Sequence, residues 1–151
     1  MSTVGAARPG PAAWDGRRIV AVATGGAAGA GVRWAVVAAT AGSTGTFPWP
    51  VLAVNVVGSL LLGLLLASAR PVDADARRVL LHDAGGIGFC GGLTTFSTFT
   101  VEIAALVRDG NAGTAAAYAV ASVASGLAAV VVGAAALHRV RAVTTPLEEQ
   151  P

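Results

Sequence analysis

Long runs of apolar residues, separated by short polar connections, make up most of the chain. Four runs approach or exceed the roughly 20 residues that a helix needs to cross about 30 Å of hydrocarbon. They cover Ile19–Thr40, Val51–Ala69, Leu80–Val107 and Thr114–Leu137. The pattern predicts an all-α integral membrane protein whose four transmembrane helices form one domain over residues 19–138.

The two ends of the chain differ from these runs. Residues 1–18 are rich in Pro, Gly and Ala, and residues 139–151 are polar. We expect a disordered head and a disordered tail there. The first apolar run is about 22 residues long, which is longer than a signal-peptide core, so no cleaved signal is expected.

The third run contains an interruption. Its stretch Gly85–Glu102, GGIGFCGGLTTFSTFTVE, places glycines, hydroxyls and a carboxylate inside an apolar segment. A broken helix at membrane depth is tolerated where it is buried in protein or lines an ion site. We expect Gly91 to Thr94 to leave helical geometry, and their carbonyls to be hard oxygen ligands suited to Na⁺.

Composition supports the membrane assignment. The chain of 151 residues is 54% hydrophobic and 12% charged, with a mean hydropathy of +0.69. This leaves too little polar surface for a soluble globule, and no nucleic-acid partner is expected. The single cysteine, Cys90, excludes an intrachain disulfide and is interpreted as a buried small residue.

The basic residues are all arginines, and they predict one orientation. Eight lie in the head, the middle loop and the tail, at positions 8, 17, 18, 70, 77, 78, 139 and 141. Only Arg108 lies on the opposite side, and Arg33 falls within the first run. The positive-inside rule therefore places both termini in the cytoplasm.

Two polar residues interrupt the first two runs. Arg33 is costly within a span unless it faces water, a partner or the interface. It either snorkels beside an interfacial Trp34 or supplies a fixed positive charge at an anion vestibule. Asn55 either bridges helices or donates its amide to a passing anion. We favour the second function for Asn55.

After the break, rings and hydroxyls share a face. Helical spacing places Thr95, Phe99 and Glu102 on one stripe, flanked by Phe96 and Thr98. The two rings are either ordinary core or present their positive edges to an anion. Glu102 is taken as the only embedded carboxylate, and it is either a functional group or a residue that reaches the interface.

Small and hydroxyl residues mark faces for close packing. Gly25 and Gly29 are spaced so that another helix backbone can approach closely. Tyr118 and Ser122 lie one turn apart in the fourth run. Tyr118 belongs either to an aromatic belt or to a pore, and Ser122 either bonds back to its own helix or lines that pore.

Three motifs together carry a specific resemblance. They are the run Gly88–Glu102, the run Gly25–Arg33, and Asn55 followed by Gly58. These motifs resemble the CrcB/Fluc family of bacterial fluoride channels. The resemblance implies a dimer of antiparallel four-helix subunits, with two fluoride pathways and one central Na⁺ that is not transported.

The resemblance also implies roles for individual residues. Gly91 and Thr94 would supply oxygens to the Na⁺, and Arg33 matches the basic residue of the first-helix motif. The fluoride pathway would be lined by aromatic, amide and hydroxyl side chains: Asn55, Phe96, Phe99, Tyr118 and Ser122. Thr95 and Ser97, beside the rings, are our further candidates for the pathway. Arg33 and Glu102 are our candidates for polar support near the vestibule.

Two features depart from the family pattern. Relatives often carry Gly-Thr where this chain has Pro50 and Val51, so one hydroxyl donor is missing. The arginine bias is unexpected for subunits that insert both ways. It favours a heterodimer with an oppositely oriented homologous chain.

Other classes of protein fit less well. A small multidrug exporter would need a carboxylate in the first run, and that run has none. A scaffold without transport would explain the glycines but not Asn55 or the stripe of rings and hydroxyls. An enzyme is not expected, because aspartyl chemistry needs two facing carboxylates and no base lies at the depth of Ser97.

Overall fold

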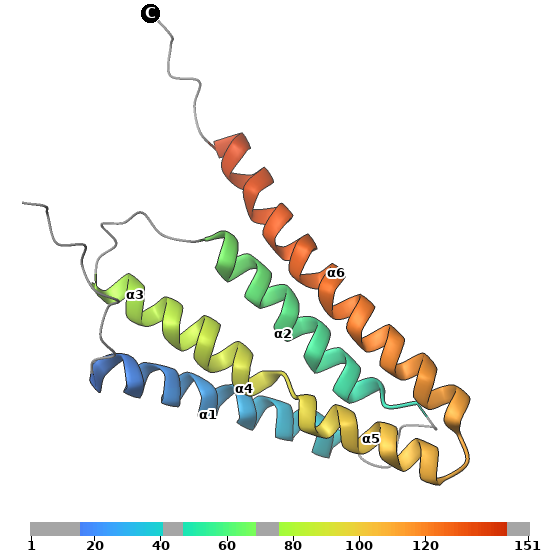
Figure 1. The fold of residues 1–151 in the computed structure, drawn as a ribbon. Coiled ribbons are helices and arrows are strands. Elements are labelled where there is room, and N and C mark those ends of the chain that lie inside the picture. The colour runs from blue at the N-terminus through green and yellow to red at the C-terminus, as the bar shows by residue number, and fades with distance from the viewer. Residues whose placement is uncertain (1–15, 41–46, 69–75, 145–151) are drawn as a thin grey trace, which may run out of the picture.

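A computed structural model of the chain describes residues 16–40, 47–68 and 76–144. These residues are almost entirely helical (Figure 1). The elements are α1 (Gly16–Ala39), α2 (Trp49–Ala67), α3 (Ala76–His82), η1 (Asp83–Cys90), α4 (Gly91–Leu93), α5 (Phe96–Arg108) and α6 (Ala112–Thr144). The four predicted spans are confirmed by length and composition, and the third comprises α3, η1, α4 and α5.

The helices alternate in direction and lie side by side. The third span lies between α1 and α2, and α6 covers the other side of α2 (Figure 1). The chain neighbours α1 and α2 touch little, whereas α1 packs on η1 and α4, and α2 packs on α6. The bundle is therefore held mainly by contacts between spans that are not consecutive in the sequence.

Glycines allow α1 and the third span to approach backbone to backbone. A Cβ atom added at Gly25 would lie 2.0 Å from the carbonyl oxygen of Ala84, and one at Gly29 would lie 2.2 Å from that of Phe89. The third span also presents a glycine to α1: a Cβ at Gly92 would lie 2.2 Å from the carbonyl oxygen of Gly26. The close-packing face predicted at Gly25 and Gly29 is confirmed.

A second pair of glycines joins α2 to α6. A Cβ at Gly63 would lie 2.2 Å from the carbonyl oxygen of Val130, and one at Gly133 would lie 2.3 Å from that of Leu60. Gly110, between α5 and α6, has φ +80 and so allows the chain to reverse direction with few residues. Both helix interfaces thus depend on positions where a side chain would collide with backbone.

The break in the third span lies slightly later than predicted. Gly91, Gly92 and Leu93 remain helical, which corrects the expectation that the glycines leave helical geometry. The backbone is extended at Thr94 (φ −76, ψ 154) and Thr95 (φ −148, ψ 124). The glycines before the break are instead part of the wide π-helical and α-helical turns that pack on α1.

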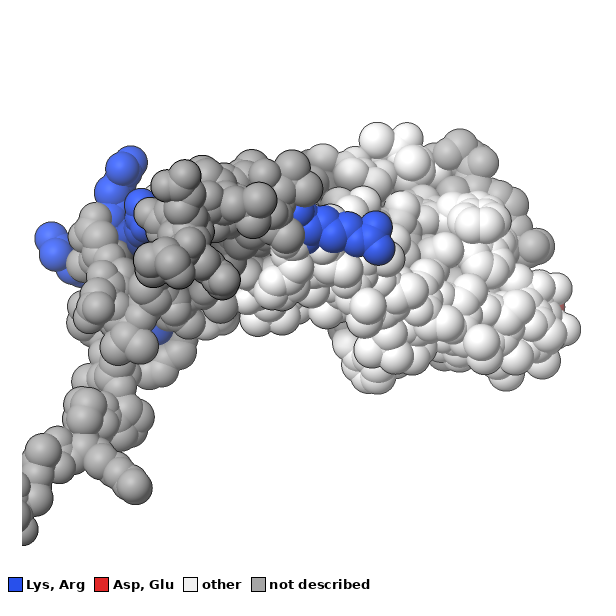
Figure 2. All heavy atoms as spheres, turned by 90° about the horizontal axis from the view of Figure 1, so that it is seen from above, with Lys and Arg blue, Asp and Glu red and all other residues white. Residues whose placement is uncertain are grey.

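The described arginines gather mainly at one end of the bundle. Arg17 and Arg18 begin α1, Arg77 and Arg78 lie in α3, and Arg139 lies near the end of α6. Arg108 lies at the opposite end, where α5 finishes. In Figure 2 most of the blue side chains lie at one end, one further blue side chain lies over the middle of the face, and the rest of the described surface in this view is white apart from a trace of red at the far edge.

The predicted boundaries of the head and the tail differ from those of the helices. α1 already begins at Gly16, and α6 continues to Thr144, so parts of the expected disordered segments at 1–18 and 139–151 are helical. The remaining parts, residues 1–15 and 145–151, lie outside the described residues.

Candidate ion pathway at the helix break

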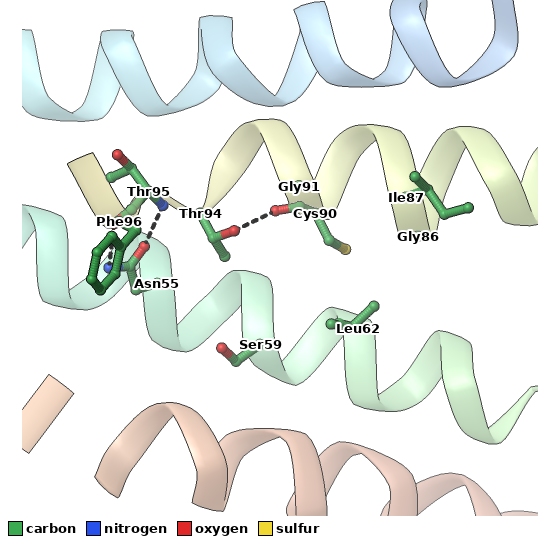
Figure 3. A pocket seen from close by; sticks show the side chains of 10 residues that line it. All are labelled: Asn55, Ser59, Leu62, Gly86, Ile87, Cys90, Gly91, Thr94, Thr95 and Phe96. Carbon is green, nitrogen blue, oxygen red and sulfur yellow. Dashed lines mark hydrogen bonds between the residues drawn. The ribbon is translucent and has the colours of Figure 1, made fainter. Parts of the chain in front are cut away.

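Asn55 on α2 holds the first extended residues of the break. The backbone N–H of Thr95 donates to Asn55 Oδ1 at 2.8 Å, and Asn55 Nδ2 donates to the carbonyl oxygen of Thr95 at 3.2 Å (Figure 3). Asn55 therefore bridges two helices, and one of its two N–H donors is used for that bridge. The amide lies beside the ring of Phe96 in the same view.

Thr95 caps α5. Its Oγ1 accepts from the backbone N–H of Thr98 at 3.1 Å, which satisfies one of the free donors at the start of a helix. The same hydroxyl lies 3.1 Å from Thr98 Oγ1 and 3.2 Å from Ser97 Oγ. Three hydroxyls thus gather at the N-terminus of α5, where the helix dipole favours negative charge.

A cavity of about 490 Å³ opens beside the break. It is lined by residues from α2, the third span and the break itself, among them Asn55, Ser59, Gly91, Thr94 and Phe96 (Figure 3). The cavity combines apolar walls with amide and hydroxyl groups. Such a mixture is typical of a site for a small ligand.

Backbone carbonyls before the break suit a hard cation. The N–H of Thr95, which a continuous helix would direct to the carbonyl of Gly91, is bound to Asn55 instead. Gly91 is exposed, and a Cβ there would meet nothing within 4 Å, so its backbone is accessible. Thr94 Oγ1 donates to the oxygen of Cys90 at 2.9 Å, which leaves its own carbonyl as the candidate ligand.

Three rings form a row along α5 and α6. The centroids of Phe96 and Phe99 lie 5.7 Å apart, and those of Phe99 and Tyr118 lie 5.3 Å apart. Phe99 is 9% exposed and belongs to the core, whereas Phe96 is 77% exposed. The interpretation of both rings as ordinary core therefore fails for Phe96.

Two hydroxyls on α6 are buried, and among the described residues neither has a hydrogen-bond partner other than the second hydroxyl of the pair. They are Tyr118 Oη and Ser122 Oγ, one helical turn apart. Ser125, by contrast, bonds back to the carbonyl of Ala121 at 2.5 Å. The alternative in which Ser122 bonds to its own helix is thus wrong, and Tyr118 is fully buried rather than placed in an exposed aromatic belt.

Arg33 and Glu102 add charge near these contacts without bonding to them, and the carboxylate of Glu102 is close enough to Tyr118 for an electrostatic interaction. Both side chains are half-buried, on α1 and α5 respectively, and neither forms a hydrogen bond or an ion pair with another residue in the described ranges. Trp34 beside Arg33 is 74% exposed, as expected of an interfacial anchor.

The sequence analysis missed one buried charge. Asp83, at the start of η1, is 2% exposed, so Glu102 is not the only embedded carboxylate. Its Oδ2 accepts from Arg18 Nε at 2.7 Å, and His82 Nδ1 lies 3.9 Å from its Oδ1. An acidic residue near the start of an apolar run, with an arginine at the same end of another run, was the available signal.

Comparison with known proteins places this architecture in one family. The model of the family "CrcB-like protein, Camphor Resistance (CrcB)" matches residues 20–134. The chain is 42% identical over 129 residues to "Fluoride-specific ion channel FluC 1" of Mycolicibacterium paratuberculosis, covering 84% of this chain and 95% of that protein. It is 43% identical over 116 residues to "Fluoride-specific ion channel FluC" of Novosphingobium aromaticivorans, covering 74% and 89%.

A third relative extends the agreement. The chain is 42% identical over 130 residues to "Fluoride-specific ion channel FluC 1" of Mycobacterium tuberculosis, covering 84% of this chain and 95% of that protein. The expectation of a channel rather than an enzyme is confirmed, and the multidrug exporter is excluded. By the match over all four spans, this chain is a member of the CrcB family.

Proposed function

We propose that this chain forms a passive, fluoride-selective channel that lowers the concentration of fluoride in the cytoplasm. The observation that carries the proposal is the pair of buried hydroxyls, Tyr118 Oη and Ser122 Oγ, which lie beside the row of rings and have no hydrogen-bond partner outside the pair among the described residues. Unpaired donors at membrane depth are costly, so they need an occupant that accepts hydrogen bonds. A dehydrated anion passing along α6 supplies one.

Fluoride suits this set of groups. A small, strongly hydrated anion needs many donors to replace its water, and conduction also needs binding that is not too tight. The pathway would offer the second N–H of Asn55, the hydroxyls of Thr95, Ser97, Tyr118 and Ser122, and the ring edges of Phe96 and Phe99. Arg33 would attract anions to a vestibule, with Glu102 as polar support near it.

We propose a structural Na⁺ at the break, which is not transported. Hard cations take about six or more oxygen ligands, and the candidate carbonyls of Gly91 and Thr94 are only two. A second subunit facing the first would double that number. Two subunits would thus supply four protein oxygens, and further oxygens, such as those of water, would complete the shell. The donor set is therefore consistent with a Na⁺ only in a dimer in which each subunit supplies half of the protein ligands.

The dimer would be antiparallel, with the cavity beside the break as part of its interface. Phe96 is exposed at the edge of that cavity, as expected of a ring that completes a pathway together with the other subunit. Because the arginines are biased toward one end, we propose that the partner is a homologous chain of opposite orientation. Both termini of this chain would then be cytoplasmic, in the plasma membrane of a bacterium.

Efflux from liposomes tests the channel. The purified chain is reconstituted into vesicles loaded with fluoride, a K⁺ ionophore is added, and efflux is recorded with a fluoride electrode. Rapid fluoride efflux, with no efflux from matched vesicles loaded with chloride, is expected from the chain alone or from the chain co-expressed with its oppositely oriented homologue. The absence of fluoride efflux from both preparations would refute the proposal.

A reporter fused to the C-terminus tests the orientation. Activity on the cytoplasmic face alone is expected in cells. Equal activity on both faces of the membrane would show dual insertion, and would replace the heterodimer by a homodimer.

A further inference from the structure

The row of rings continues beyond the pathway proposed above, into the connection between α1 and α2. The centroids of Tyr118 and Phe47 lie 5.5 Å apart at an interplanar angle of 88°, and those of Phe47 and Trp49 lie 4.4 Å apart. The row thus has two exposed ends, Trp49 and Phe96, and a buried middle, where Tyr118 is 0% exposed. Of the rings in this row, that of Phe47 lies outside all four spans.

The backbone holds Phe47 in a fixed place. Trp49 N–H donates to the carbonyl of Phe47 at 2.9 Å, and Pro48 between them has φ −78 and ψ 63. These values are those of an inverse γ-turn, which reverses the chain over three residues. Pro50 then fixes the first turn of α2, so the ring of Phe47 is carried by a short, rigid connection.

This ring closes one side of the pocket around Tyr118. Phe99 contacts the tyrosine ring from α5, and Phe47 contacts it nearly at right angles, which is a favourable arrangement for two aromatic rings. Val51 and Ala115 belong to the same buried cluster, and Phe47 is packed against it. The Tyr118 hydroxyl has only the Ser122 hydroxyl, one turn along the same helix, as a hydrogen-bonding neighbour, so the ring contacts set where its oxygen lies.

We infer that Phe47 is a positioning residue that acts through Tyr118: it fixes the ring so that the phenol can donate to an anion on the α6 hydroxyls. The inference rests on the proposed channel function for its consequence, but not for the contact itself. Loss of the Phe47 ring leaves space beside Tyr118 and allows the phenol to take other rotamers. The donor is then present but no longer held where the ion passes.

The first test reports on the position of the ring without any transport. Tyr118 is the only tyrosine of the chain, so 3-fluorotyrosine labels this one site. One narrow ¹⁹F resonance is expected from the labelled wild type, and a shifted or broadened resonance from Phe47→Ala and from the milder Phe47→Leu. Trp34→Ala, which removes an exposed ring that has no ring contact in the described residues, is the matched control and should leave the signal unchanged.

The second test is a double-mutant cycle in the liposome assay. Phe47→Ala should slow fluoride efflux about tenfold, whereas Phe47→Tyr, which keeps a ring, should stay within twofold of the wild type. In the Tyr118→Phe background, where no hydroxyl remains to be positioned, Phe47→Ala should change efflux by less than twofold. A merely structural role would instead give the same loss in both backgrounds.

The outcomes distinguish failure of the positioning role of Phe47 from failure of the proposed channel function. An unchanged ¹⁹F signal in both Phe47 variants, or an equal loss of efflux with and without the Tyr118 hydroxyl, would overturn the positioning role. A wild-type protein that conducts no fluoride in either preparation would refute the channel instead. The ¹⁹F comparison would still decide whether Phe47 holds the ring.

Discussion

Asn55 gives Thr95 the hydrogen-bond partner that the break in the helix removes. The N–H of Thr95 donates to the Asn55 side chain at 2.8 Å across 40 residues of sequence, and the same side chain donates to the Thr95 carbonyl. In hydrocarbon an unpaired N–H is costly, so the extended geometry at the break depends on an amide from another helix. The break and Asn55 therefore form one structural unit.

Replacement of this amide should destabilise the protein. Asn55→Leu keeps the number and branching of the side-chain heavy atoms but leaves the N–H of Thr95 buried without a partner, which costs about 1–3 kcal/mol. We expect this loss in SDS unfolding from mixed micelles. Ser59→Ala, which lines the same cavity one turn away and removes a hydroxyl without a hydrogen bond to the described residues, is the control. Equal stability of the two variants would contradict the role of Asn55.

A methyl group at Gly29 should separate α1 from the third span. Its Cβ would lie 2.2 Å from the carbonyl oxygen of Phe89, and neither atom belongs to a flexible side chain. Overpacking of this kind costs about 1–3 kcal/mol or more. Gly31→Ala in the same helix, where a Cβ meets nothing within 4 Å, should be neutral or slightly stabilising. The same unfolding assay compares them, and similar losses at both positions would argue against the close contact.

Loss of the Arg18 side chain should lower the free energy of unfolding more than loss of the charge on its partner Asp83. Arg18→Gln leaves the buried carboxylate of Asp83 without its 2.7 Å ion pair, a change that costs about 3–5 kcal/mol in buried pairs. Asp83→Asn removes the buried charge itself and should cost less. Their combination should be more stable than Arg18→Gln alone. Strictly additive losses in unfolding measurements would show that the two groups act independently.

Sodium should stabilise the assembled channel. A cation that binds only the folded dimer raises stability by RT ln(1 + [Na⁺]/Kd), so the melting temperature should rise with the logarithm of Na⁺ concentration. Ionic strength is kept constant with K⁺ or an organic cation, neither of which should substitute. A melting temperature that is the same in Na⁺ and in K⁺ would remove the proposed central ion.

A hydroxyl at position 51 should restore a donor to the pathway. Val51 is 1% exposed and lies in one buried cluster with Phe99 and Tyr118. Val51→Thr has nearly the same shape and places an O–H donor beside the pathway, so fluoride efflux should rise several-fold while chloride stays excluded. Val51→Ile, which changes the packing without adding a donor, is the control. Equal effects of both substitutions would assign the change to packing.

The sequence predicted the spans because apolar length is a local property. It also predicted the packing face at Gly25 and Gly29, since the spacing of small residues marks such a face directly. The position of the break was wrong by a few residues, because two glycines suggest a loss of helix. Here, close contact with α1 keeps them helical, and the extended geometry falls on the two threonines that follow.

Contacts between distant residues were harder to predict. The amide of Asn55 was expected to serve an anion, and its pairing with Thr95 depends on the register of two helices, which no local pattern gives. The same applies to Asp83 with Arg18 and to Phe47 with Tyr118. Each pair is at least 40 residues apart in the chain, and each becomes visible only when the order of the spans in space is known.

That order has a consequence for biosynthesis. The main partner of α1 is η1, and about 40 residues must be translated between the two elements, which takes roughly 2 to 8 seconds on a ribosome. During this interval the glycine-lined face of α1 lacks the third span, which is its main partner in the finished structure. The chain cannot mature as two successive hairpins. Its assembly must wait for the third span to reach α1 and for the fourth to reach α2, and a truncation after α2 should yield two inserted helices that do not associate.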